Sequence, residues 1–210
     1  MSLWAMTWRG DGRARRWTKG TARFFLAWFF RGLFLVSISL AGAQTQNGAP
    51  TEYQIKANFL SSFTKFVEWP PESLSSKSAR LQICILGETG FSDELEKATR
   101  GETVKGHRIE IIHDVKNVGQ IDRCHILFVS ASATGQFRKL REELRGRSIL
   151  TVGESAGFVE QGGMINLVRD GGIVLLEVNQ TRAQAARLKI SAKLLSVAKA
   201  VTTSEGRQGR

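Results

Sequence analysis

Hydrophobic and polar positions along the chain follow two different periods, and the first long segment has the period of a helix. Residues 51–69, TEYQIKANFLSSFTKFVEW, place apolar side chains over nearly half of a helical wheel. This pattern predicts an amphipathic helix that ends at Pro70-Pro71, because proline breaks a helix and disfavours helical geometry in the residue before it. The apolar positions are Tyr53, Ile55, Phe59, Leu60, Phe63, Phe66 and Val67.

After a polar loop, short apolar runs alternate with helical segments. Continuous apolar strands that are separated by helices are typical of a parallel sheet with both faces covered. The predicted strands are Leu81–Leu86, Arg108–His113, Ile126–Val129 and Ser148–Val152, and the predicted helices are Phe91–Thr99 and Thr134–Leu144.

The pattern changes near the C-terminus. The apolar runs MINLV and IVLLEV flank RDGG, and Asp170-Gly171 between such runs predicts an antiparallel hairpin. A last helix is predicted from Thr181 to Val201, followed by a disordered tail over residues 202–210. The predicted fold class is α/β, a three-layer α/β/α sandwich with a mostly parallel sheet and an antiparallel hairpin at its edge.

The first 43 residues differ from the rest. Basic residues lead, an apolar run follows, and Ala41-Gly42-Ala43 is a small-x-small cleavage signal, so a signal peptide that is cleaved near Ala43 is predicted. A retained membrane anchor is the alternative, but Arg31 leaves an uninterrupted run shorter than the roughly 20 residues that span a bilayer. The predicted organisation is a signal peptide (1–43), a short linker (44–51), one α/β domain (52–201) and the tail.

The predicted signal peptide also accounts for much of the positive net charge of the chain. The whole chain has a formal net charge of +11, and its first 43 residues hold seven basic residues and one acid, which is more than half of the excess. Trp69 and Tyr53 are the large polar aromatics after residue 43, too few for a base-stacking surface. Nucleic acid is therefore not a predicted partner.

An exported chain folds in a compartment where disulfides persist, so the two cysteines are candidates for a disulfide. Cys84 and Cys124 both lie in runs predicted to be buried strands, LQICILG and CHILFVS. A bridge between them is predicted, and two buried core thiols are the alternative.

One motif points to catalysis, because Gly153–Gly157 fits the G-x-S-x-G pattern of a serine nucleophile elbow. In the α/β-hydrolase fold the catalytic histidine follows the serine, whereas all the histidines here, His107, His113 and His125, precede Ser155. Three glycines from Gly157 to Gly163 also disfavour the helix that an elbow needs. The segment is predicted to be a strand followed by a glycine-rich turn, and the protein is predicted not to be an enzyme.

Other candidate sites are weaker. Gly87–Gly90 lies between a strand and a helix, where α/β folds bind phosphates, but it lacks the third glycine of G-x-G-x-x-G and the lysine of a P-loop. The histidines and cysteines have no close metal-ligand spacing. No metal or cofactor is predicted, and Glu154 and Glu160 beside the turn form no defined carboxylate pair.

Five segments in order resemble the YfiR/HmsC-type periplasmic proteins (DUF4154), over about residues 52 to 201. They are IKANFLSSFTKFVEWP, CHILFVS, ILTVGES, FVEQGGMINLV and ARLKISAKLLSVAK. The resemblance implies a periplasmic binding protein that represses an inner-membrane diguanylate cyclase through its periplasmic sensor domain, and so lowers cyclic di-GMP and biofilm formation. It also implies that Cys84 and Cys124 match a cysteine pair of the family, whereas a second pair found in some members is absent.

Two functions remain as hypotheses at this level. The first is repression of a diguanylate cyclase, or of a sensor kinase, through its periplasmic domain. The alternative is binding of a small molecule at the carboxyl ends of the sheet strands. A homodimer is a further candidate assembly. The predicted contact residues, in the turn from Glu154 to Gly163 and on the last helix, are Glu154, Ser155, Phe158, Glu160, Arg182, Lys189 and Lys193.

Overall fold

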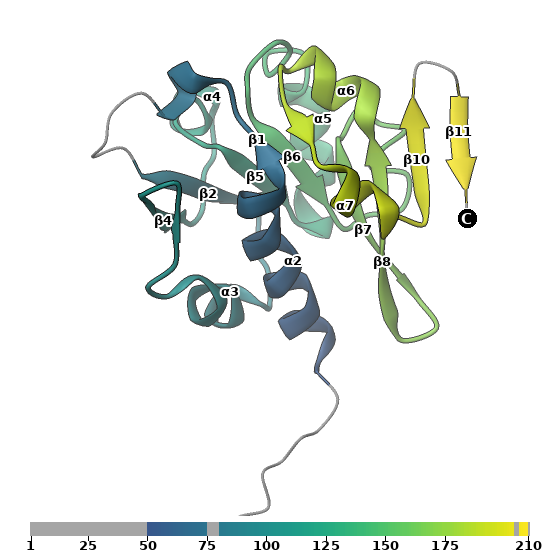
Figure 1. Ribbon diagram of the computed structural model, residues 1–210, viewed down its shortest axis with the longest axis horizontal. Coiled ribbons are helices and arrows are strands. Elements are labelled where there is room, and N and C mark those ends of the chain that lie inside the picture. The colour runs from purple at the N-terminus through teal and green to yellow at the C-terminus, as the bar shows by residue number, and fades with distance from the viewer. Residues whose placement is uncertain (1–49, 75–79, 204–205, 210) are drawn as a thin grey trace, which may run out of the picture. The chain divides into compact units, whose positions relative to one another are not determined.

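Nine strands form the main sheet of the computed structural model, which describes residues 50–74, 80–203 and 206–209 (Figure 1). Five neighbouring pairs of strands are parallel and three are antiparallel, which confirms the mostly parallel sheet. In spatial order the strands are β11 (Gly206–Gly209), β10 (Ala200–Thr203), β8 (Ile173–Asn179), β7 (Ile165–Asp170), β6 (Leu150–Gly153), β5 (Ile126–Val129), β2 (Leu81–Leu86), β4 (His107–Ile112) and β3 (Thr103–Val104).

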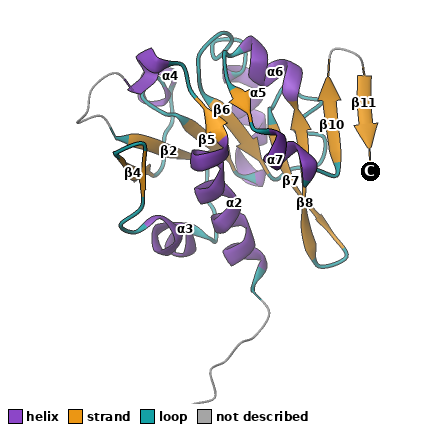
Figure 2. Cartoon of the chain, viewed as in Figure 1, coloured by secondary structure: helices purple, strands orange, loops and turns teal. Residues whose placement is uncertain are grey.

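Helices cover both faces of this sheet, which confirms the three-layer sandwich (Figure 2). One face packs against α2 (Glu52–Phe66), α3 (Ser92–Thr99), α6 (Gln180–Ala185) and α7 (Ala192–Ser196). The other packs against α4 (Val118–Ile121) and α5 (Thr134–Leu140). Two short 3-10 turns, η1 (Pro71–Leu74) and η2 (Ala131–Ala133), complete the connections.

The central strand β2 shows why both faces are apolar. Ile83 and Ile85 belong to the core under α2, and Cys84 and Leu86 belong to the core under α5. Because successive side chains of a strand point to opposite faces, a strand buried on both sides must be apolar throughout. Cys84 forms a disulfide with Cys124, which immediately precedes His125 and β5, with 5.8 Å between the Cα atoms. The predicted bridge is confirmed.

The predicted hairpin is present, since β7 and β8 pair antiparallel from Ile165↔Val178 to Asp170↔Ile173. The sheet continues beyond it, however. Strand β10 pairs parallel with β8, and β11 pairs antiparallel with β10. Part of the predicted disordered tail is therefore ordered, because the β-branched run Val201–Thr203 extends a strand along the outer edge of β8.

The prediction of one long helix from Thr181 to Val201 is wrong. The segment forms α6, the short strand β9 (Lys189–Ile190), α7 and the start of β10. Helix α6 ends at Ala185, and Arg187, just after the C-cap Ala186, has a φ of 58°. The amides of Arg187 and Leu188 donate to the carbonyls of Gln184 and Ala183. This is a Schellman stop. It occurs without glycine, so the sequence gives no clear signal for it.

The first helix also ends earlier than predicted. A capping box between Thr51 and Gln54 begins α2, and the helix ends at Phe66 instead of at Trp69. The next two residues form β1 (Val67–Glu68), which pairs antiparallel with β9. The helical spacing of apolar side chains continues through Val67, but there the backbone pairs with β9 instead of continuing the helix.

His125 is buried at the amino end of β5. Its Nδ1 accepts a hydrogen bond from the Gln82 amide at 3.1 Å, and its Nε2 lies 3.0 Å from the Ser73 carbonyl, which requires the neutral Nε2–H tautomer. Burial lowers the pKa of His125, and repulsion from His107 lowers it further, against the opposing hydrogen bond to Ser73. Protonation of Nδ1 would break the bond from Gln82.

We expect the free energy of unfolding to fall as the pH decreases below about 6.5, by at most about 1.4 kcal/mol per pH unit from this group. The unfolded state binds the proton more readily, so the stabilisation is present above the unfolded pKa and is lost as the pH falls through the folded pKa. Urea unfolding of wild type and His125→Gln at pH 7.5 and 5 measures the difference. The exposed His113→Gln is the control, and an equal pH dependence of wild type and His125→Gln would refute the assignment.

The predicted signal peptide and most of the predicted linker lie outside the described residues. Among the residues that are described, no helix is long and apolar enough to cross a membrane.

Candidate functional site

The glycine-rich turn from Glu154 to Gly163 connects β6 to the parallel strand β7. Residues 155–162 form turns instead of the helix that follows a nucleophile elbow. The Ser155 hydroxyl lies 2.6 Å from the Thr134 hydroxyl, and the Ser155 carbonyl accepts a hydrogen bond from Asn166 at 2.9 Å. His125 lies at the far, amino end of β5. The geometry agrees with the sequence argument against an elbow serine.

Glu154 belongs to a nearly buried network of ion pairs, which is not among the sites predicted from the sequence. Lys56, from the second turn of α2, lies 2.7 Å from both Glu154 and Glu52, and its side chain is only 8% exposed. Glu154 also accepts a hydrogen bond from the Ala131 amide at 3.1 Å, and Arg169 of β7 pairs with Glu52 at 3.2 Å. The network therefore ties α2 to η2, to the turn after β6 and to the hairpin.

The carboxylates determine the charge state of Lys56. Burial lowers the pKa of Lys56, but the hydrogen bonds to Glu154 and Glu52 outweigh it, so the pKa is raised overall. Lys56 in turn lowers the pKa of Glu52 through their hydrogen bond. A lowered carboxyl pKa stabilises the fold above the ordinary carboxyl range and loses this contribution in acid, whereas the raised lysine pKa loses its contribution only in strong base.

We expect Glu154→Lys to lower the free energy of unfolding by about 3 kcal/mol, because it places a second cation beside the buried Lys56. The exposed Glu160→Lys, in the same turn, is the matched control and should cost less than about 1 kcal/mol. Urea unfolding at pH 7 measures both values. Equal unfolding midpoints for the two variants would show that the network does not stabilise the fold.

The structure places Phe158 in the core, where it is not exposed for the predicted contact. Its side chain is fully buried, and its ring packs against Phe137 with 4.7 Å between centroids. The backbones of Gly153 and Gly163 lie so close to this ring that a Cβ atom at either position would overlap it. Phe158 therefore anchors the turn to the core.

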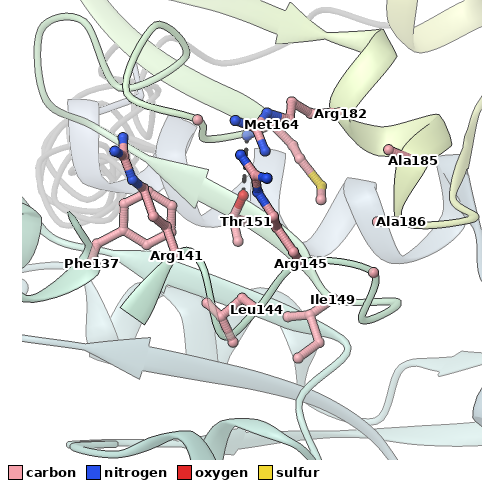
Figure 3. Close-up of a pocket in the computed structure, with 12 residues that line it drawn as sticks. Phe137, Arg141, Leu144, Arg145, Ile149, Thr151, Met164, Arg182, Ala185 and Ala186 are labelled. Atoms are coloured by element: carbon pink, nitrogen blue, oxygen red, sulfur yellow. Dashed lines mark hydrogen bonds between the residues drawn. The ribbon is translucent and has the colours of Figure 1, made fainter. Parts of the chain in front are cut away.

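The turn and the segment after β8 meet at a cavity of about 290 Å³ (Figure 3). Arg182 of α6 lines it together with Gly162 of the turn, and α5 and the segment after it contribute Arg141 and Arg145. Figure 3 shows Arg141 and Arg145 extending from the α5 side while Arg182 reaches toward them from α6. Two of the segments predicted to make contacts are thus neighbours in space.

Arg182, Lys189 and Lys193 do not form the predicted stripe on one helix, because that helix is interrupted. Lys189 is exposed on β9, opposite Glu68 of β1. Lys193 is exposed on α7, with its Nζ 5.4 Å from the centroid of the Phe66 ring. Glu160 is exposed on the turn. The predicted contact residues are therefore spread over separate surfaces.

The carboxyl ends of the central strands offer little room for a ligand. The connection after β2 leads to one side of the sheet and that after β5 to the other, so the crevice where doubly wound sheets bind ligands lies between them. There, Gly87 (φ 84°) approaches the side chains of Ser130 and Ala133 so closely that a Cβ atom would overlap them. Direct packing of the two loops fills this crevice.

The same end of the molecule carries exposed apolar side chains. Within the described residues, the exposed large hydrophobic side chains are Tyr53, Ile173 and Val197, with exposed fractions of 48%, 57% and 60%. Ile173 lies at the end of the β7–β8 hairpin, which is tied to α2 by the Arg169–Glu52 pair and to the start of β10 by Lys199, 2.9 Å from Asp170. We call the exposed end of this hairpin, around Ile173, the hairpin-end surface.

In the described part of the chain, no group of three or more His, Cys, Asp or Glu side chains is placed to hold a metal ion. The features described here are a buried ion network, a turn anchored by Phe158, an arginine-lined cavity and the hairpin-end surface.

Comparison with known proteins identifies a family whose profile covers most of the chain. The profile of the YfiR/HmsC-like family (DUF4154) matches residues 53–199, which confirms the resemblance drawn from the sequence. No curated protein matches the chain. A crystal structure of a conserved domain protein from Vibrio cholerae O1 biovar El Tor has a TM-score of 0.44 and 11% identity, over 72% of this chain and 60% of that chain. This chain thus covers less than two thirds of that protein.

Proposed function

Because the chain belongs to the YfiR/HmsC-like family, whose members act as periplasmic regulators in the cyclic di-GMP pathway, we propose that it restrains a membrane-bound diguanylate cyclase by binding its periplasmic sensor domain. The match over residues 53–199 is the observation that carries this proposal, because it spans nearly the whole described fold. The proposal includes export to the periplasm by the signal peptide, and a binding role instead of catalysis.

The hairpin-end surface is our candidate for the contact with the partner. Exposed apolar side chains at the end of a hairpin can enter a partner's apolar pocket at little cost, since their removal from water is favourable. Ion pairs on both sides of the hairpin, together with the core packing of its inward-facing side chains, hold it in place. The exposed charges Lys189 and Lys193 form a rival contact surface on β9 and α7.

We expect deletion of the gene to raise cyclic di-GMP and surface attachment, and reintroduced wild type to restore both. Ile173→Asp should fail to restore repression although the protein folds, because a charge at the end of the hairpin opposes burial against an apolar partner. Thr103→Asp is the matched control, since Thr103 is also exposed and β-branched but lies in β3 at the far edge of the sheet. Cyclic di-GMP is quantified by mass spectrometry, and the periplasmic protein by immunoblot.

Three outcomes decide between the surfaces and the functions. If Ile173→Asp still restores repression and the double variant Lys189→Glu/Lys193→Glu does not, the contact lies at the basic residues instead. Unchanged cyclic di-GMP on deletion, with every candidate cyclase present, would refute the cyclase proposal. A sensor kinase whose output changes on deletion would then be the partner.

A further inference from the structure

The arginine-lined cavity carries more positive than negative charge among the described residues. Arg141, Arg145 and Arg182 line it, and its lining contains no Asp or Glu. Glu142, outside the lining, approaches Arg141 and Arg145 at 3.5 and 2.8 Å. The guanidinium of Arg182 has no hydrogen-bond or ion-pair partner among the described residues. The three guanidinium groups, with no carboxylate in the lining, make the cavity electropositive.

Besides the ion pairs with Glu142, contacts with the turn position two of the arginines. Arg141 donates to the Gln161 carbonyl at 2.8 Å, while its buried Nε makes no hydrogen bond within the described chain. A terminal nitrogen of Arg182 lies 3.3 Å from the position that a Cβ on Gly162 would occupy. Gly162 has a φ of 99°, so the turn presents bare backbone to the guanidinium. Fixed guanidinium groups of this kind suit an oxyanion, which accepts two parallel hydrogen bonds from one such group.

The rest of the wall is apolar. Phe137, Leu144, Ile149 and Met164 line the cavity beside the arginines, and all four are buried. A cavity of about 290 Å³ is close to the lower end of ligand pockets, and a cavity of about 150 Å³ already holds benzene. The space fits an aromatic ring with one head group.

We propose that this cavity binds a small organic anion: one oxyanion head group, a carboxylate or a phosphate monoester, on an apolar body of about one ring. The head group pairs with Arg182, with Arg145 or Arg141 beside it, and the apolar body lies against Phe137 and Met164. The site is separate from the carboxyl ends of the strands, because Ile149 and Thr151 place it at the amino end of β6. It does not depend on the proposed action on a cyclase.

Isothermal titration calorimetry on the protein purified from the periplasm tests this, with benzoate and phenyl phosphate as probes. Benzyl alcohol tests the need for charge, and inorganic phosphate tests the need for an apolar body. We expect saturable 1:1 binding of benzoate or phenyl phosphate, no binding of benzyl alcohol, and weaker binding of inorganic phosphate. Arg182→Gln should weaken binding about tenfold or more, since it removes a charge-assisted pair.

Arg138→Gln is the matched control, because Arg138 is exposed on α5 and does not line the cavity. It should bind like wild type. Ala185→Leu is a second variant that narrows the cavity from an exposed helix position, where folding tolerates leucine, and it should also weaken binding. The proposal is overturned if neither probe binds, if Arg182→Gln and Ala185→Leu both bind like wild type, or if inorganic phosphate binds as tightly as phenyl phosphate.

Discussion

We expect Cys84→Ala to lower the free energy of unfolding by about 4 kcal/mol. The Cys84–Cys124 disulfide closes a loop with a sequence separation of 40, and the larger part of its stabilisation comes from the conformations that it removes from the unfolded chain. Both cysteines also lie in the apolar core under α5, so the loss of the bridge leaves their packing incomplete.

Urea unfolding of the oxidised protein, of the reduced protein and of Cys84→Ala measures this effect. Reduced wild type and Cys84→Ala should unfold at similar urea concentrations, both well below oxidised wild type. Cys84→Ala/Cys124→Ala is the control for the single free thiol that the first variant creates. Equal midpoints with and without reductant would contradict the prediction, and so would alkylation of either cysteine in the folded protein without reductant.

The central part of the fold can be predicted from the sequence because its apolar and polar positions follow a regular pattern. Strand β2 begins at Leu81 and ends at Leu86 as predicted, since a run that is apolar at every position except Gln82 favours burial on both faces. The hairpin β7–β8 follows from Asp170-Gly171, where two glycines with positive φ close the turn. These elements depend on local residues alone.

The C-terminal segment is less predictable because tertiary contacts decide it. Residues 181–201 have helical spacing throughout, and alanine-rich segments favour helices. The chain nevertheless breaks at Arg187, pairs β9 with β1 and then adds β10 to the sheet. These pairings need strand edges contributed by distant segments, which no local pattern reveals.

The ion network at Lys56 had a signal in the sequence. On the helical wheel of α2, Lys56 falls between Phe63 and Val67, in the middle of the apolar positions. A lysine at such a position needs a buried carboxylate, because an unpaired buried charge is costly. Its partner Glu154 could not be chosen from the sequence, since 98 residues separate them.

The contact residues were the least predictable part, for a related reason. A turn that follows a strand is expected at the surface, and its side chains are then candidates for contacts. This turn is a crossover between the parallel strands β6 and β7 that lies against the face of the sheet, so Phe158 points inward while Glu160 points outward. The direction of each side chain depends on the path of the crossover, which the sequence does not specify.

Phe158→Ala should therefore lose activity through instability instead of through a lost contact. The fully buried ring contributes to the core with Phe137, and removing it leaves a cavity between α5 and the turn. We expect the free energy of unfolding to fall by about 3–5 kcal/mol, the usual cost of replacing a buried phenylalanine by alanine. Gly153 and Gly163 leave no side chain of their own to fill the space.

Phe158→Leu separates the two roles, because it keeps much of the buried volume while it removes the aromatic ring. It should cost less than Phe158→Ala and should repress the cyclase like wild type once its periplasmic level is matched. Urea unfolding, immunoblots of the periplasm and cyclic di-GMP measured on the same strains give the three values. If Phe158→Ala unfolds at the wild-type urea concentration and still fails to repress, Phe158 acts on the partner, and the turn must then open when the partner binds.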